Sequence, residues 1–418
     1  MARPAMKFGL FYEHQLPRPW TDRDEHRLLH EALEQVVLAD RLGFDYAWEV
    51  EHHFLEEYSH SSAPEVFLAS AAALTERIRL GHGIRQVIAN YNHPARTAET
   101  VATLDLLSHG RVDFGIGEGA TRLELGGFGI PAKHKRAMAL EAAEQIANMM
   151  VMEPYPGFES DSFSMPCRNV LPKPLQKPHP PMWMACTNRD TIKVAARNGV
   201  GALTFSFVDP EEAQTWVGTY YDIIRSEECV PLGHAVNANV AMVTGFSLHE
   251  DRAEAIRRGQ EGFEFFGYAL NALVAQDTVP GRSELWSRFQ AARTTSTEDV
   301  VRAALAAGDD YAAGIGTPTD MQRHLIRFED AGVDQVIFLQ QVGRNRHADI
   351  CASLELFAET ILPAFGDREA ARVAHKQATL APYLEAALAR KPVLAPLRDE
   401  DIPVVRASAK HAQLARGR

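Results

Sequence analysis

The sequence predicts an α/β protein whose chain forms a closed (β/α)8 barrel (a TIM barrel), and three observations support this fold class. Short apolar runs alternate strictly with amphipathic segments of helical period, about eight times between residues 6 and 365. Such alternation produces a parallel sheet, and this number of units fits the closed barrel. An open doubly wound sheet, the alternative, would require a glycine-rich phosphate loop after the first strand, where the sequence is LFYEHQLPRP.

The first half of the chain shows the alternation clearly. A strand over 7–12 precedes a helix that begins near the N-cap candidate Thr21 and ends at Gly43. A later helix has Pro94 at its first position and Gly110 at its end, the usual asymmetry of helix ends. The other strands and helices of this half are expected, in chain order, over 45–50, 64–75, 77–88, 93–110, 111–117 and 134–152.

The second half continues the same pattern. Short runs rich in apolar residues predict strands, and each is followed by a longer segment of helical period. Strands are expected over 181–186, 201–207, 236–246 and 334–340. Helices are expected over 188–198, 210–227, 319–332 and 346–362.

Two segments interrupt this rhythm. Residues 250–315 are too long for one connection and contain GFEFFGYALNALV and SELWSRFQAA, which predict a helical, lid-like insertion before the last helix–strand unit. Residues 366–418 follow the barrel domain, 1–365, and are rich in alanine and charge. For this tail we expect a helix over 366–390 and an extended arm that serves oligomerisation.

Composition excludes several classes of function. The chain has 418 residues, 46% of them hydrophobic and 23% charged, and a net charge of −12. That charge argues against nucleic acid or an anionic membrane as the partner. No signal peptide and no membrane-spanning run are expected. The four cysteines, Cys167, Cys186, Cys229 and Cys351, lack the spacing of a zinc site or a disulfide framework, so we expect reduced thiols in a cytoplasmic protein.

The stretch DYAWEVEHHF, residues 45–54, places Glu51, His52 and His53 at the end of the second strand. In a barrel this end lies at the active face, where an imidazole can transfer protons near neutral pH. Adjacent histidines on an extended strand point to opposite faces, so no metal site is expected there. His26 and His30 share a helical face but have no third ligand in the sequence.

Glycines follow the fourth strand in the segment GIGEG, at positions 115, 117 and 119. They would let the backbone approach a flat or anionic ligand, although a tight turn explains the pattern equally well. Asn92 and His93, after the third strand, lie at the same face.

Four blocks of sequence resemble the bacterial luciferase-like flavin monooxygenases in order and spacing. They are EHHF, NHPARTAETVATLDLLSHGRVDFGIGEG, PKPLQKPHPPMWMACTNRDTIKVAARNGVGAL and GTPTDMQRHLIRFEDAGVDQVIF. The resemblance implies a TIM barrel that binds reduced FMN at its C-terminal face. It also implies that a separate NAD(P)H:flavin reductase supplies the FMN, and that O2 reacts with it to a C4a-hydroperoxide that oxidises a small organic substrate.

Further expectations about individual residues come from the resemblance. His52 and Glu51 match the catalytic histidine and the acid before it, and the Gly83–Ile84 bond matches a non-prolyl cis peptide that supports the flavin ring. The other residues expected to bind the cofactor are Asn92, Gly117, Glu118, Arg136, Cys186, Thr187, Asn188 and Arg189.

Glu118 departs from the luciferase pattern, which has an arginine there that meets the phosphate. An acid would repel a phosphate, so binding must rest on Arg136, Arg189 and backbone amides, with Arg122 as a further cation; otherwise Glu118 faces the substrate as a base or cation partner. An apolar or aromatic substrate pocket is expected from aromatic side chains: Tyr12, Trp48, Phe54, Trp183, Phe205, Phe207, Phe265, Phe266 and Tyr268.

Two other functions remain open from the sequence. One is a deazaflavin-dependent dehydrogenase of the same superfamily, which transfers hydride without oxygen. The other is a flavin-binding protein without catalysis, which Glu51 and His52 disfavour because mere binding does not need them. The resemblance also implies a homodimer or a larger homo-oligomer.

Overall fold

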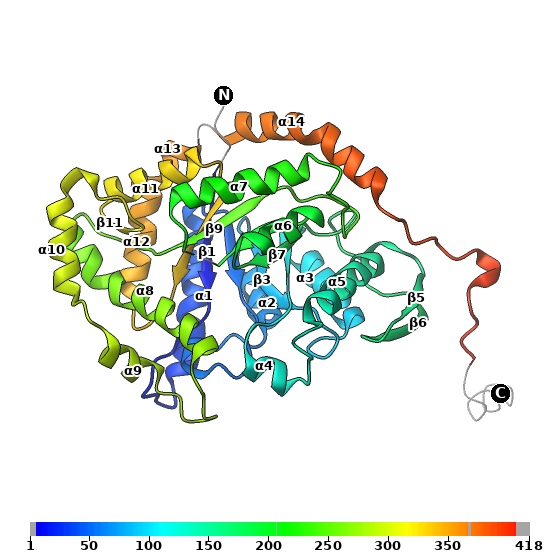
Figure 1. Cartoon of the computed structure of the whole chain (residues 1–418), viewed down its shortest axis with the longest axis horizontal. Coiled ribbons are helices and arrows are strands. Elements are labelled where there is room, and N and C mark those ends of the chain that lie inside the picture. The colour runs from blue at the N-terminus through cyan, green and yellow to red at the C-terminus, as the bar shows by residue number, and fades with distance from the viewer. Residues whose placement is uncertain (1–5, 206, 367–368, 407–418) are drawn as a thin grey trace.

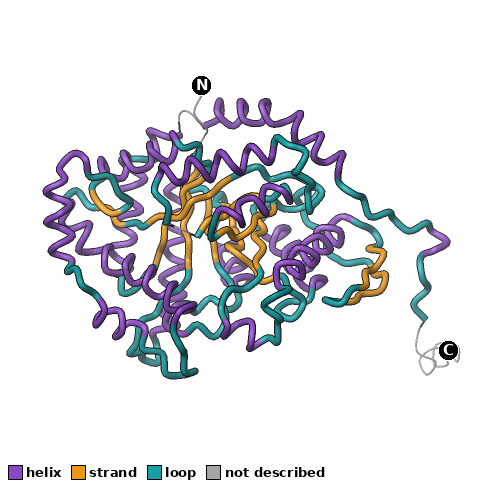
Figure 2. Tube along the Cα trace, in the orientation of Figure 1, coloured by secondary structure: helices purple, strands orange, loops and turns teal. Residues whose placement is uncertain are grey.

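The computed structural model describes residues 6–205, 207–366 and 369–406. Within these ranges, eight parallel strands close into a barrel in the order β1-β12-β9-β8-β7-β4-β3-β2, which confirms the predicted TIM barrel (Figures 1 and 2). The strands are β1 (Lys7–Tyr12), β2 (Tyr46–Glu49), β3 (Arg79–Gln86), β4 (Val112–Gly117), β7 (Met182–Cys186), β8 (Gly201–Thr204), β9 (Val240–Thr244) and β12 (Gln335–Gln340).

Helices connect these strands and surround the barrel. Proline stands in the first turn of α2, α3, α7 and α11, where its missing N–H costs nothing. Their ends lie within a few residues of those expected. They are α1 (Asp24–Leu42), α2 (Pro64–Leu74), α3 (Pro94–Leu107), α5 (Lys135–Val151), α6 (Arg189–Arg197), α7 (Pro210–Ile224), α11 (Pro318–Asp330), α12 (His347–Thr360) and α13 (Leu362–Gly366).

Two elements between β4 and β7 were not predicted. A hairpin forms from β5 (Tyr155–Glu159) and β6 (Ser164–Arg168), and a one-and-a-half-turn helix, α4 (Arg122–Gly127), follows β4. Gly157 and Pro166 weaken any strand signal in the hairpin. The α4 segment RLELGG is too short to show a helical period, although Thr121 caps it by accepting from Glu124 N–H.

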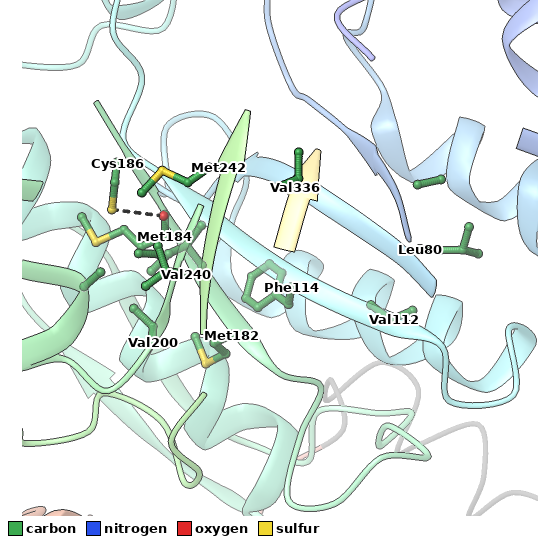
Figure 3. Close-up of a cluster of buried hydrophobic side chains, with 14 of the residues drawn as sticks. Leu80, Val112, Phe114, Met182, Met184, Cys186, Val200, Val240, Met242 and Val336 are labelled. Atoms are coloured by element: carbon green, nitrogen blue, oxygen red, sulfur yellow. Dashed lines mark hydrogen bonds between the residues drawn. The ribbon is translucent and has the colours of Figure 1, made fainter. Parts of the chain in front are cut away.

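Strand side chains alternate between two layers. Trp48, Trp183 and Leu203 fill the inside of the barrel, and a Cβ on Gly81 would lie 2.1 Å from the Trp48 ring, so only glycine fits there. The opposite faces pack against the helices, as Figure 3 shows for Leu80, Val112, Phe114, Met182, Met184, Cys186, Val240, Met242 and Val336, and Val200, just before β8, belongs to the same cluster.

The segment 250–315 contains three α-helices, α8 (Arg252–Ala275), α9 (Leu285–Ala292) and α10 (Thr297–Ala307), and the short helix η2 (Gly308–Asp310). A short parallel pair, β10 (Ser247–Leu248) with β11 (Ile315–Gly316), joins its two ends. Glu57, in the short helix η1 (Glu56–Tyr58), accepts hydrogen bonds from Ser283 Oγ and from the N–H groups of Leu285 and Trp286. The insertion is therefore fastened to the loop that follows β2, at the C-terminal face of the barrel.

The tail begins with α14 (Glu369–Arg390), which is held against the barrel at its end. Arg390 donates to the carbonyls of Ser226 and Cys229, and Lys391 donates to that of Leu232. Residues 392–406, which include the turn η3 (Asp399–Asp401), then extend away from the body of the molecule (Figure 1). Val404 and Val405 are 85% and 67% exposed, so the arm presents apolar side chains to solvent.

Deleting residues 393–418 is expected to reduce the number of chains in the assembly in solution. Exposed valines on an extended segment are stabilised by docking on another surface, and fifteen extended residues can reach up to about 50 Å. Light scattering on the intact and truncated chains measures the change. The double substitution Val404→Asp and Val405→Asp should act in the same direction, whereas Leu305→Asp, an exposed change on α10, should not. An equal number of chains in the assemblies of the intact and truncated proteins would show that the arm plays no part in assembly.

Within the described ranges, no helix combines the length and the apolar character that crossing a membrane requires.

Candidate functional site

A cavity opens at the carboxyl ends of the barrel strands. Its empty volume, including the part open to solvent, is about 1020 Å³. Mostly apolar side chains form the walls, and polar groups gather at two ends. One end contains Glu13, Glu51, His52, Tyr58 and Gln86. The other contains Glu118, Lys135, Arg136, Thr187 and Thr191.

His52 lies at the first of these ends, between two carboxylates. Its Nδ1 is 2.9 Å from Oε1 of Glu124, and its Nε2 is 3.6 Å from Oε2 of Glu13. Glu124 belongs to α4 and is fully buried. It is held by Thr121 Oγ1, which donates to Oε2 at 2.8 Å, and by the N–H of His53, which donates to Oε1. Glu124 therefore fixes the orientation of the imidazole ring.

These contacts shift the pKa values of the group. Burial, the largest single influence on His52, lowers its pKa, but the carboxylates of Glu13 and Glu124 together outweigh burial and raise it to about 9. Burial raises the pKa of Glu13 to about 7. Burial also opposes ionisation of Glu124, yet the charge and hydrogen bond of His52 keep its pKa below the usual value. At neutral pH the site therefore holds an imidazolium ready to donate a proton.

Glu51, expected from the sequence to act as a pair with His52, directs its hydrogen bonds to other residues, although its charge contributes to raising the pKa of His52. Its Oε1 is 3.1 Å from Nε2 of His53 and accepts from Asn92 Nδ2 at 2.8 Å, and its Oε2 accepts from Gln86 N–H at 2.9 Å. Successive extended residues point in different directions, so only one of the two neighbours could turn toward α4. Glu51 lines the cavity and joins the ends of β2 and β3. Asn92 supports Glu51 and does not line the cavity itself.

Part of the cavity wall comes from the adjacent strands β3 and β4. Gly83, Ile84 and Gly117 belong to it, and the Gly83–Ile84 peptide is cis, as expected from the sequence. A Cβ on Gly117 would lie 2.0 Å from Cδ1 of Ile84, so a larger residue cannot occupy this position without displacing the isoleucine. This part of the wall therefore suits a planar group that contacts the barrel closely.

The second polar end is basic but partly neutralised. Arg136 donates from Nε and Nη2 to the two oxygens of Glu118, both at 3.0 Å, and Lys135 Nζ lies 3.3 Å from Glu118. Thr187 and Thr191 belong to the adjoining start of α6. Two cations against one acid leave an excess of positive charge that suits an anion.

Three expected cofactor residues lie elsewhere. Arg189 pairs with Glu212 on the outside, where its side chain is 54% exposed, and Asn188 caps α6 by accepting from Thr191 N–H. Cys186 faces the outer helices and its Sγ donates to the carbonyl of Met184 (Figure 3). Burial raises the pKa of this thiol to about 12, so it stays protonated. The reason is strand alternation, which turns Cys186 outward when Ala185 turns inward.

Among the aromatic residues expected in the substrate pocket, Phe205 and Phe266 line the cavity. Tyr12 instead faces α1, where its hydroxyl donates to Gln35 at 3.2 Å. Trp48 and Trp183 pack against each other inside the barrel, with ring centroids 5.3 Å apart. These three side chains therefore belong to the core of the fold.

The other aromatic residues that were expected in the substrate pocket also lie outside the cavity. Phe54 is 55% exposed and stacks on Phe128, and Phe207 lies at a neighbouring hollow. Inside the insertion, Phe265 packs on Trp286 and Phe289, and Tyr268 packs on Phe289. Because the insertion has its own small core, only one face of α8 can reach the cavity.

Glu13, Tyr58 and Glu124 were not singled out from the sequence. Glu13 directly follows the first strand, so the rule that barrel sites lie at strand ends could have found it. Glu124 gave no such signal, because it lies on the unpredicted helix α4. Among the described residues, no cluster of three or more His, Cys, Asp or Glu side chains could hold a metal ion.

Comparison with known proteins adds independent information. The family model for luciferase-like monooxygenases matches residues 6–335. The oxygenase component of a flavin-dependent trigonelline monooxygenase from Acinetobacter baylyi is 25% identical over 383 residues, which are 88% of this chain and 98% of that protein. A limonene 1,2-monooxygenase from Rhodococcus erythropolis is 37% identical over 137 residues, 32% of this chain and 35% of that protein.

Solved structures share the fold. The monooxygenase RslO1 from Streptomyces bottropensis matches with a TM-score of 0.69 and 27% identity, over 86% of this chain and all of that one. The oxygenating constituent of 3,6-diketocamphane monooxygenase from Pseudomonas putida, solved with FMN, matches with a TM-score of 0.65 over 86% of this chain and 98% of that one. At 19% identity this second likeness concerns the fold alone.

Proposed function

The chain belongs to the luciferase-like monooxygenase family and is a flavin-dependent monooxygenase, and we propose that it is the oxygenase of a two-component system. It takes reduced FMN from a separate flavin reductase and uses O2 to oxygenate a small, largely apolar molecule. The observation that carries this proposal is the cavity itself, whose lining combines glycines, a basic cluster and a buried histidine.

The residues of the cavity fit FMN. Gly83, Ile84 and Gly117 offer a surface without protruding polar side chains for the ring system. Lys135 and Arg136, beside the start of α6, offer positive charge for the phosphate. When bound, reduced flavin supplies the electrons that activate O2, and one oxygen atom enters the substrate.

The protein's own side chains bind, orient and handle protons. His52 can donate a proton from Nε2 into the cavity, while Glu124 holds Nδ1 and keeps the ring charged. Phe205, Phe266 and Leu270 cover the cavity with apolar surface, which limits the entry of water. Because Phe266 and Leu270 belong to α8, we assign the insertion the role of a lid.

Two measurements test the proposed cofactor and reaction. Anaerobic calorimetry should show that reduced FMN binds more tightly than a reduced deazaflavin. With an added flavin reductase and labelled O2, one labelled oxygen atom should enter the product of a turned-over substrate. Tighter binding of the deazaflavin, together with hydride transfer in the absence of O2, would overturn the proposal in favour of a dehydrogenase.

The Glu118→Gln substitution is expected to tighten binding of FMN by roughly threefold to tenfold, because it removes a negative charge that competes for Arg136 and Lys135. Calorimetry with FMN and with riboflavin measures the effect, and riboflavin, which has no phosphate, is the matched control ligand. Glu228→Gln breaks an exposed pair with Arg197 and controls for total charge. If the substitution increases the affinity for FMN and for riboflavin equally, Glu118 does not act on the phosphate.

A further inference from the structure

The second oxygen of Glu13 is an unfilled acceptor inside the candidate site. Oε1 accepts a hydrogen bond from the Tyr58 hydroxyl at 3.1 Å. Oε2 accepts none from the described residues, and its nearest cation is His52 Nε2 at 3.6 Å. The side chain is 4% exposed and lines the cavity. A buried carboxylate normally has all its strong acceptor positions filled, so this one indicates a missing donor.

Glu49 Oε2 also lacks a donor but does not line the cavity, whereas the other two carboxylates of the candidate site, Glu51 and Glu124, do not share this property. Both carboxylate oxygens of Glu51 have hydrogen-bond partners, which are Asn92, Gln86 and His53. Both oxygens of Glu124 have partners as well. When Glu13 is ionised, the lone imidazolium of His52 cannot balance the carboxylates of Glu13 and Glu124 that flank it, and a cation bound at Oε2 favours that ionised form. This end of the cavity therefore attracts a cation and repels an anionic substrate.

The walls beside Glu13 are aromatic and apolar. The ring of Tyr58 lies 5.7 Å from that of Phe266, and Phe205 and Leu270 complete this side of the cavity. Aromatic faces attract cations as well as apolar groups. A carboxylate with an unfilled acceptor in such surroundings matches a ligand that combines an apolar body with one charged nitrogen.

We propose that the substrate is an apolar or aromatic amine, bound as its ammonium cation, whose N–H donates to Oε2 of Glu13. This rests on the oxygenase function proposed above and narrows its substrate to one chemical class. Glu13 then selects substrates that carry a positive charge. His52 remains the proton donor, and Lys135 and Arg136 remain the site for the anion.

Calorimetry with three ligands of nearly the same shape tests the proposal on the full chain, with and without FMN. Phenethylamine is expected to bind at least about tenfold more tightly than phenethyl alcohol, and phenylacetate more weakly still. Glu13→Gln should weaken amine binding by roughly 30-fold or more, the size expected when a buried charge pair loses one partner. The FMN titration is independent, so failure of FMN to bind and failure of the amine preference are distinguishable.

Control variants separate recognition from folding. Glu25→Gln replaces an exposed carboxylate that pairs with His60 and should keep the amine preference. Equal affinity for amine and alcohol, or an unchanged preference in a folded Glu13→Gln protein, would overturn the proposal. Equal binding of phenethyltrimethylammonium would overturn the N–H contact.

Discussion

Replacing His52 by glutamine is expected to lower the rate of substrate oxygenation by roughly 10²- to 10⁴-fold, the usual contribution of one general acid–base group. Glutamine can still form hydrogen bonds but carries no transferable proton in this pH range. FMN binding should change little, because His52 contacts Glu13 and Glu124, whereas Lys135 and Arg136 contact Glu118. Turnover with a supplied reductase measures the loss, and the yield of hydrogen peroxide per O2 consumed should rise. A variant with normal turnover would show that His52 does not handle the proton.

The Glu124→Gln substitution separates positioning from catalysis. Because the carboxylate of Glu124 helps to raise the pKa of His52, its loss should lower that pKa. The alkaline limb of the pH–rate profile should therefore move to lower pH, while glutamine preserves an acceptor for Nδ1. Glu25→Gln, which alters the exposed pair with His60, is the matched control and should leave the profile unchanged.

Replacing Arg111 by methionine is expected to destabilise the fold by about 3–5 kcal/mol. The guanidinium is 8% exposed and donates to the carbonyls of Ala72, Thr75, Ile78 and Ser108. Methionine fills a similar volume but leaves these carbonyls without a donor. Urea unfolding followed by fluorescence measures the change in the free energy of unfolding.

The segment NHPARTAETVATLDLLSHGRVDFGIGEG, which contains Arg111, also contains a suitable control residue. Arg96 is exposed and pairs with Glu99, so Arg96→Met should change stability by less than about 0.5 kcal/mol. Similar losses for the two variants would contradict the assigned role of Arg111. Loss of FMN binding in a folded Arg111→Met protein would contradict it as well.

These contacts explain why the block NHPARTAETVATLDLLSHGRVDFGIGEG is so distinctive. Asp105 accepts from the backbone and side chain of Gln176, and Ser108 and Arg111 close the turn before β4. Most of this block holds the barrel together, and its last glycines shape the cavity. The family was recognisable mainly from residues that support the fold, so the resemblance by itself said less about the chemistry of the site.

The barrel could be predicted because its signals are local. Alternating apolar runs, proline at helix starts and glycine at helix ends act over a few residues, and the structure places the expected barrel elements within a few residues of their predicted ends. The elements that were not predicted are short or interrupted, as α4 and the β5–β6 hairpin show. In these segments, contacts with the rest of the molecule outweigh the weak local pattern.

The sequence by itself determined the fold class, the face that carries the site, and the place of His52 at the end of the second strand. Only the tertiary structure decided which carboxylates surround it. Glu124 reaches His52 across 72 residues of sequence and Glu13 across 39, whereas the adjacent Glu51 turns to His53. Strand geometry separates neighbours in the chain, and barrel closure brings distant strand ends together. The partners of a site residue therefore depend on long-range packing, which no local pattern encodes.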